Sequence, residues 1–130
     1  MEILISHDTA RISYHPLGYL QLEWHEGYCC GELYRQSLEE LLCVAEHRSI
    51  KKILLNQQNK EYYLSGDTVW SLQQWYPRLA KALGVGSKLA IILQQHLLPF
   101  RVEKRYEAAI LQNAVFSSLQ EACSWLIEEH

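Results

Sequence analysis

Ser65 is the residue whose type and position could carry regulatory chemistry. It opens the segment Ser65-Gly66-Asp67-Thr68, which begins a helical pattern after a polar loop. Serine is among the preferred N-cap residues, and Asp67 would meet the positive end of the helix dipole in the first turn. We therefore predict that Ser65 caps this helix. The alternative is a regulatory site, because a phosphate there would place roughly two negative charges at the helix start.

Aromatic side chains gather in the same part of the chain. Five of them lie between positions 62 and 76, and the loop before them is rich in amides from position 56 to 59. Aromatic residues are common at interaction hot spots and in apolar ligand pockets. The equally weighted alternative is that these rings extend the core beneath the loop. We predict an interaction or ligand surface formed by Asn56, Tyr62, Tyr63, Trp70 and Trp75.

The remaining candidates for chemistry favour structural roles. The four cysteines lack the spacing of a disulfide framework or zinc site, so we expect them reduced, with Cys29 and Cys30 as small buried residues. The six histidines include no pair at helical ligand spacing. The segment Gly84–Lys88 runs from a helix into a strand, which is the reverse of a phosphate-binding loop. We expect no cofactor, no metal and no catalytic residue, and an enzyme is the least favoured class.

The elements that must position these residues are organised around Lys51–Asn56. This short apolar run is typical of a strand buried on both faces. Before it, the alternation from Leu20 to Trp24 predicts a strand with one covered face, and the turn signal at positions 15–18 joins it to positions 10–14 as a hairpin. A helix should follow Gly27, with a stripe at Tyr34, Leu38, Leu41, Leu42 and Ala45.

Downstream of the buried strand, the pattern predicts two further β-α units. One helical face should carry Val69, Leu72, Tyr76, Leu79 and Leu83, with Pro77 kinking or restarting the helix and Gly84 ending it. A second buried strand follows at Lys88–Leu93. We then expect a loop at Gln94–Pro99, a helix with a weak stripe from Val102 to Ile110, a strand at Ala114–Phe116, and a terminal helix opened by a capping box at Ser117–Glu121.

Length and composition set the class of protein. A chain of 130 residues with 48% hydrophobic content is expected to form a single α/β domain covering residues 1–130. Its net charge of -3, without a basic stripe, argues against nucleic acid as a partner. The start Met1–Asp8 lacks the features of a signal peptide, and no apolar run is long enough for an integral membrane segment. We expect a soluble, cytoplasmic protein.

Several segments of the chain resemble a known family. They are the Gly18–Trp24 strand, the Gly27-Tyr28 pair, Lys51–Asn56, Trp75–Ala80 and Phe116–Leu126. Together they look like small bacterial proteins that resemble STAS domains, the fold of anti-sigma factor antagonists. The resemblance implies a STAS-like mixed sheet in which an N-terminal β-hairpin precedes β-α units whose helices pack on the sheet.

The resemblance also implies a position for a phosphoswitch. Anti-sigma factor antagonists carry a phosphorylatable serine, preceded by aspartate, at the helix start after the central strand. This chain has Tyr63-Leu64-Ser65-Gly66 at the matching place. The aspartate is absent, and Leu64 stands where the modified serine would be.

These observations favour a binding module, foremost a protein-protein interaction or regulatory domain. The alternative is a carrier of a small apolar ligand that uses the aromatic residues as a pocket. A closed pocket with converging polar groups would favour a ligand, whereas a flat aromatic patch would favour a protein partner. We also predict a homodimer, because a small domain with an exposed hairpin edge tends to cover that edge by self-association.

Overall fold

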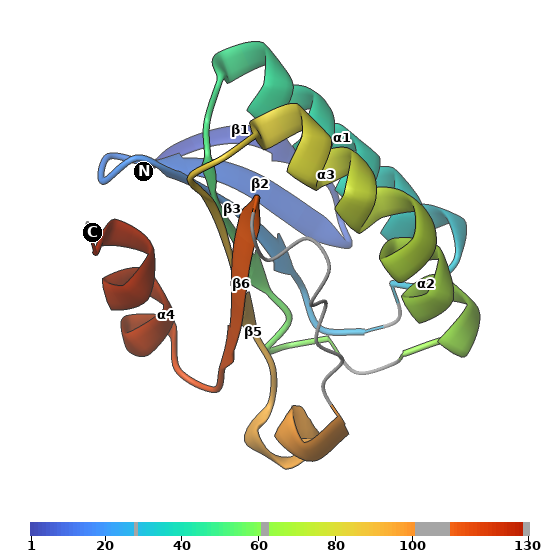
Figure 1. Ribbon diagram of the computed structural model, residues 1–130. Helices are drawn as coiled ribbons and strands as arrows, with labels where there is room; N and C mark the ends of the chain where they lie inside the picture. The colour runs from blue at the N-terminus through green and yellow to red at the C-terminus, as the bar shows by residue number, and fades with distance from the viewer. Residues whose placement is uncertain (28, 61–62, 101–109, 129–130) are drawn as a thin grey trace.

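The computed structural model describes residues 1–27, 29–60, 63–100 and 110–128, which form an α/β fold around a six-stranded mixed sheet. The strands lie in the order of the chain, from β1 at one edge to β6 at the other (Figure 1). Helices cover both faces, which confirms the predicted fold class. Among the described residues, no helix combines the length and the apolar character that a membrane span requires.

The N-terminal part of the sheet is antiparallel. Strands β1 (Glu2–Ser6), β2 (Ala10–His15) and β3 (Tyr19–Trp24) pair in sequence, and Ala10 of β2 lies opposite Trp24 of β3. The turn between β2 and β3 closes with a 2.9 Å hydrogen bond from the Gly18 amide to the His15 carbonyl. Gly18 adopts a φ of 97°, which favours glycine. The predicted hairpin and its turn are confirmed.

The rest of the sheet is parallel. Strands β4 (Lys52–Asn56), β5 (Ser87–Ile92) and β6 (Leu111–Phe116) follow β3, and each new strand is added on the same side. Crossovers of one hand that step in one direction place their helices on one face of the sheet. Both predicted buried strands are confirmed, and the last strand begins three residues before the predicted start at Ala114.

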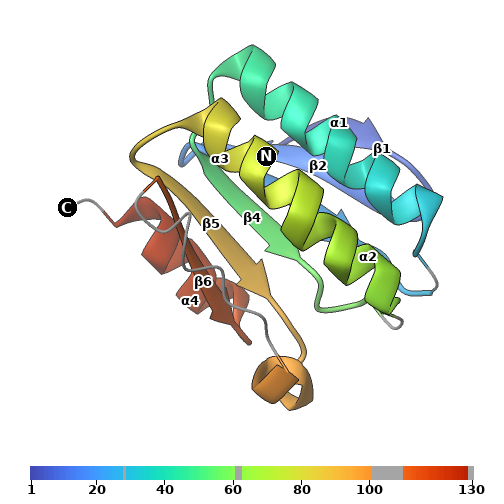
Figure 2. The same cartoon turned by 45° about the vertical axis from the view of Figure 1, so that its right-hand side comes forward.

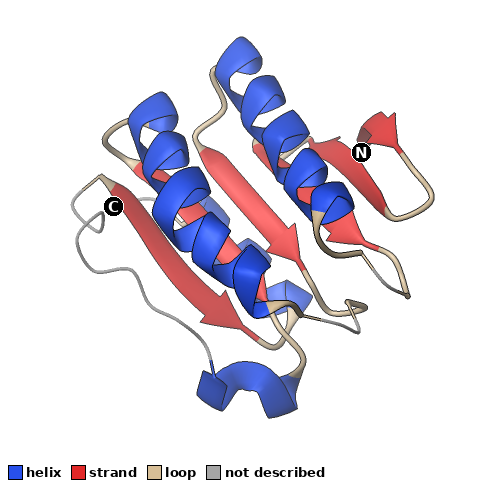
Figure 3. Ribbon diagram, turned by 90° about the vertical axis from the view of Figure 1, so that its right-hand side faces the viewer, coloured by secondary structure: helices blue, strands red, loops and turns tan. Residues whose placement is uncertain are grey.

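The helices divide between the two faces. Helix α1 (Glu32–Arg48) and the continuous run of α2 (Ser65–Trp70), the π-helical turn η1 (Ser71–Trp75) and α3 (Tyr76–Leu83) lie side by side in front of the strands (Figures 2 and 3). Helix α4 (Leu119–Ile127) lies on the opposite side of the sheet from α1 and α3 (Figure 1). We call these the α1/α3 face and the α4 face.

The core consequently has two layers, and alternation along each strand assigns side chains to one or the other. In β4, Ile53 and Leu55 join the α1/α3 layer, whereas Leu54 packs in the α4 layer with Tyr19 and Leu126. All three β4 side chains are at most 1% exposed. The predicted stripe of α1 is confirmed, since its five residues are buried.

The helical face predicted after Ser65 is wrong at Val69, which is 49% exposed, while Leu79 and Leu83 are buried and Leu72 and Tyr76 are partly buried. Buried positions along this run include Asp67, Ser71, Trp75, Leu79 and Leu83. These residues are spaced four apart because the π-helical turn takes more residues per turn than an α-helix. The wide turn ends just before Pro77, which lacks an amide for the helical ladder. Pro77 therefore restarts the helix, as predicted, and Gly84 ends it at a φ of 78°.

Two further differences concern the C-terminal third. The segment predicted as a loop at Gln94–Pro99 forms a short 3₁₀ helix, η2 (Gln95–Phe100). The helix predicted from Val102 to Ile110 lies outside the described residues, apart from Ile110, which is in a turn. The serine cap predicted as part of the capping box is confirmed at the start of α4, where the Ser118 hydroxyl accepts a 3.4 Å hydrogen bond from the Glu121 amide.

Candidate functional site

A cavity of about 130 Å³ lies beyond the carboxyl ends of the parallel strands, on the α1/α3 face. Ligand sites of open α/β sheets lie at this end of the strands. The residues that line the cavity come from α1, the segment after β4, the run from α2 to α3, and the carboxyl ends of β5 and β6. The lining residues are Tyr34, Gln57, Tyr63, Thr68, Ser71, Leu72, Tyr76, Ile91, Leu93 and Val115.

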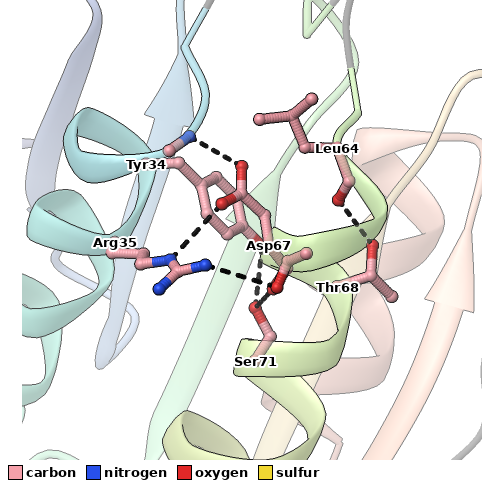
Figure 4. A network of polar contacts seen from close by, with 8 residues as sticks. Tyr34, Arg35, Leu64, Asp67, Thr68 and Ser71 are labelled. Atoms are coloured by element: carbon pink, nitrogen blue, oxygen red, sulfur yellow. Dashed lines mark hydrogen bonds and ion pairs between the residues drawn. The ribbon is translucent and has the colours of Figure 1, made fainter.

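Ser71 supplies a polar group to the cavity wall at the start of the π-helical turn. Its hydroxyl lies 3.2 Å from the hydroxyl of Tyr34 on α1 (Figure 4). The same Ser71 oxygen donates a 2.9 Å hydrogen bond to the carbonyl of Asp67, four residues earlier on the same face of the helix. Ser71 and Tyr34 therefore form a polar pair at the cavity wall.

Asp67 joins the starts of two helices just behind that wall. Its side chain is buried, and one carboxylate oxygen accepts a 2.8 Å hydrogen bond from the amide of Gly31, the N-cap residue of α1. The other oxygen lies 3.4 Å from Nε of Arg35 (Figure 4). The Arg35 guanidinium also lies 5.3 Å from the Trp70 ring centroid. A carboxylate is stabilised by helix N-terminal amides. Asp67 thus fixes α2 against α1 and sets the distance between Tyr34 and Ser71.

Lys60 is buried beside two tyrosines that line the cavity. It is 1% exposed, and its Nζ lies 5.0 Å from the Tyr34 ring centroid and 4.2 Å from the Tyr63 ring centroid. Burial lowers the pKa of Lys60 from its ordinary value, while the nearby Cys29, Cys30 and Asp67 oppose that shift. An ammonium against an aromatic face is held by the quadrupole of the ring. Lys60 therefore contacts both rings without itself being among the residues that line the cavity.

The phenols at the site keep their protons at neutral pH. Burial is the main cause that raises the pKa of Tyr34 and of Tyr63, each to about 12. Burial also raises the pKa of the Cys29 thiol, which favours the neutral form. All four cysteines are free thiols. The cavity wall is consequently neutral, with hydroxyl groups that form hydrogen bonds and rings that supply apolar surface.

Ser65 does not cap α2, so that prediction is wrong. The N-cap position belongs to Leu64, whose backbone is extended at φ -93° and ψ 134°, and no side chain caps this helix start. The Leu64 carbonyl accepts hydrogen bonds from the amides of Asp67 and Thr68, which makes Ser65 the first helical residue. Its side chain is exposed. A regulatory role for Ser65 stays a prediction.

The predicted aromatic surface is only partly realised. Trp75 is fully buried and donates a 2.8 Å hydrogen bond from Nε1 to the Leu38 carbonyl, so its assignment to a surface is wrong. Asn56 is also buried, and its Oδ1 accepts a 3.1 Å hydrogen bond from the Gln58 amide, which shapes the turn after β4. Trp70 is half-buried beneath Arg35. Tyr63 does line the cavity, and Tyr62 lies outside the described residues.

Sequence reasoning missed the residues that complete the site. Tyr34 reads as a core position on its helical stripe, and Ser71 falls outside the predicted face because the π-helical turn is not visible in a 3.6-residue period. Lys60 sits in an amide-rich loop that gives no sign of burial. In the described part of the chain, no group of three or more His, Cys, Asp or Glu could hold a metal ion.

No protein-family model, curated protein or solved structure matches the chain. The site's geometry therefore carries the functional interpretation.

Proposed function

We propose that this protein binds a small, uncharged ligand with an apolar body in the cavity beyond β4, β5 and β6. The observation that carries the proposal is the lining itself, in which tyrosine rings and aliphatic side chains surround a few converging polar groups. Such a combination is typical of ligand pockets. Its volume of about 130 Å³ is close to the roughly 150 Å³ of an engineered cavity that holds benzene. A ligand with a single six-membered ring matches this size.

A binding role also accords with the chemistry of the wall. With pKa values of about 12, the phenols of Tyr34 and Tyr63 remain protonated across the neutral range and act as hydrogen-bonding groups. Lys60 and Asp67 hold the rings and helices from behind, which pre-organises the cavity. Pre-organisation reduces the entropy lost when a ligand binds.

The proposal is tested by titrating aniline, phenol and toluene into the isotopically labelled protein and following its amide NMR signals. We expect saturable shifts at Thr68, Ser71 and Leu93, which belong to the cavity lining. Val115→Phe should fill the cavity and abolish these shifts. Val85→Phe is the matched control, since Val85 is 73% exposed and absent from the lining. Equal shifts in both variants, or none in the wild type at millimolar probe, would refute the proposal.

A protein partner is the second candidate. Beside the cavity, Tyr63 and Leu64 are each 38% exposed and Val69 is 49% exposed, so apolar surface is available next to the opening. Exposed apolar groups of this kind are common at interaction sites. The predicted homodimer is one form of this candidate. Light scattering at micromolar concentration should give twice the monomer mass, and Leu64→Lys should return the monomer; monomer mass for the wild type would remove the homodimer.

A further inference from the structure

Several hydroxyl groups of the cavity wall already donate their protons in hydrogen bonds within the protein. Ser71 donates its single hydroxyl proton to the Asp67 carbonyl at 2.9 Å. The contact between Tyr34 and Ser71 is 3.2 Å, and either oxygen could donate in isolation. Because the Ser71 proton is already used, the Tyr34 hydroxyl must be the donor in this pair. The oxygen of Tyr34 is left with lone pairs that can only accept.

Two further hydroxyls in the lining also donate their protons to backbone carbonyls. Tyr63 donates to the Gln57 carbonyl at 3.4 Å, and Thr68 donates to the Leu64 carbonyl at 3.4 Å (Figure 4). Both lining oxygens therefore also present lone pairs. The Gln57 amide can donate or accept, so it does not discriminate between ligands. Three side-chain oxygens, on Tyr34, Tyr63 and Thr68, are therefore hydrogen-bond acceptors at the wall, and Tyr76, which carries a further hydroxyl, also lines the cavity.

The groups around the cavity disfavour both cationic and anionic ligands. Among the described residues, no charged side chain lines the cavity. The Lys60 ammonium already lies against the rings of Tyr34 and Tyr63, which disfavours a second cation on the same rings. A carboxylate carries only acceptors, so it would receive no hydrogen bond from the hydroxyls of Tyr34, Tyr63 and Thr68. Neutral compounds with a proton to donate satisfy the wall best.

From this pattern we infer that the cavity selects a neutral hydrogen-bond donor on a small aromatic or cyclic body, in the manner of phenol or aniline. The inference rests on the proposed function, because it names the chemical class of the ligand for that cavity. It assigns the accepting role to the oxygen of Tyr34, whose proton is held by Ser71. A ligand of the same shape without a donor would occupy the same space but leave this acceptor unpaired.

The experiment compares four probes on the wild-type protein by amide NMR titration. Phenol and aniline carry donors, toluene has the same shape without a polar group, and benzoate carries only acceptors at neutral pH. We expect phenol and aniline to bind about tenfold more tightly than toluene, which is the size of one good hydrogen bond, and benzoate to bind most weakly. Equal affinity for phenol and toluene, or tightest binding of benzoate, would overturn the inference and leave the proposed function intact. Failure of every probe would overturn both.

Two substitutions locate the acceptor. Ser71→Ala removes the oxygen that receives the Tyr34 proton, so Tyr34 can then donate into the cavity. The preference for phenol over benzaldehyde, an acceptor probe, should fall about tenfold. Tyr34→Phe should reduce the donor preference while keeping the ring, and Tyr14→Phe on β2 is the matched control that should leave it unchanged. An unchanged preference in both Ser71→Ala and Tyr34→Phe would contradict the assignment, and the wild-type probe series tests the ligand class even if a variant fails to fold.

Discussion

The two faces of the sheet each bury a lysine, and the two ammonium groups are held in different ways. Lys88 on the α4 face donates 2.8 Å hydrogen bonds to the carbonyls of Trp125 and Glu128 at the end of α4, and its Nζ lies 4.9 Å from the Trp125 ring centroid. Lys60 on the α1/α3 face lies against the rings of Tyr34 and Tyr63, and burial lowers its pKa. The first lysine closes a helix end, whereas the second supports a cavity.

The difference follows from where each lysine sits along the parallel strands. Lys88 lies near the amino end of β5, where the last carbonyls of α4 need donors. A cation there also meets the negative end of the helix dipole. Lys60 follows the carboxyl end of β4, where the chain leaves the sheet and the starts of α1 and α2 converge. One end of the sheet is therefore closed by charge-assisted hydrogen bonds, and the other retains the space that we assign to a ligand.

The largest effect on the free energy of unfolding is expected for a substitution in the tightly packed layer between the sheet and α4. Leu54 of β4 is fully buried in the α4 layer, where it packs with Tyr19 and Leu126. Leu54→Ala should lower the free energy of unfolding by ~2 to 5 kcal/mol, because it removes apolar contacts and leaves a void. Chemical denaturation measures the change, with the exposed Leu119→Ala as a control. A loss below about 1 kcal/mol would mean that this layer relaxes as readily as an open face.

The second prediction separates the lysines directly. Lys88→Met keeps the apolar stem but removes the donor to two carbonyls at the end of α4. Charge-assisted hydrogen bonds are worth about 1.5 to 3 kcal/mol, so we expect a destabilisation of ~2 to 3 kcal/mol. Urea denaturation and the loss of amide protection in α4 measure it. A variant as stable as the wild type would contradict the role of Lys88 in closing that helix end.

Lys60→Met should behave differently, because the folded state disfavours the Lys60 cation. Replacing a buried charge by an apolar side chain of similar volume is often neutral or stabilising, so we expect a change of no more than about 1 kcal/mol at neutral pH. With its pKa lowered on folding, Lys60 binds fewer protons in the native state than in the unfolded chain. Stability of the wild type relative to Lys60→Met should therefore rise with pH between the lowered pKa and the ordinary value of 10.5.

The pH dependence is best measured below about pH 9, where tyrosines are largely protonated in both states. Denaturation of the wild type and Lys60→Met across this range gives the difference directly, and subtraction removes the titrating groups that do not interact with Lys60. A difference that falls as pH rises would mean that the native site favours the Lys60 cation. Such a result would make the two lysines alike, contrary to the comparison.

Local patterns in the sequence predict the sheet and most helices, but not the cavity wall. The buried strand at Lys51–Asn56 and the Ser118 cap are both encoded within a few residues, so period and turn chemistry identify them. The inward position of Ser71 is recognisable only through its contact with Tyr34 on α1, and Trp75 likewise reaches across to α1. Lys60 depends on rings from two other segments. Contacts between residues far apart in the sequence cannot be predicted from the local pattern of residue types.

The smallest expected effect concerns two serines at helix starts, one on each face. The Ser118 hydroxyl accepts the Glu121 amide at the start of α4, so Ser118→Ala should cost ~1 kcal/mol. Ser65 occupies the first helical position of α2, is exposed and does not cap the helix. Ser65→Ala should therefore change the free energy of unfolding by less than about 0.5 kcal/mol, as is usual for exposed positions.

Parallel urea denaturation of Ser118→Ala and Ser65→Ala measures the difference between the two helix starts. The contrast arises because α2 is fixed by Asp67, whose carboxylate reaches the Gly31 amide of another helix, while α4 is capped by its own serine. The start of α2 thus takes its stability from tertiary contacts behind the cavity. Equal losses in the two variants would show that Ser65 caps its helix in solution after all, and the Leu64 backbone would then need a different conformation at the edge of the proposed ligand site.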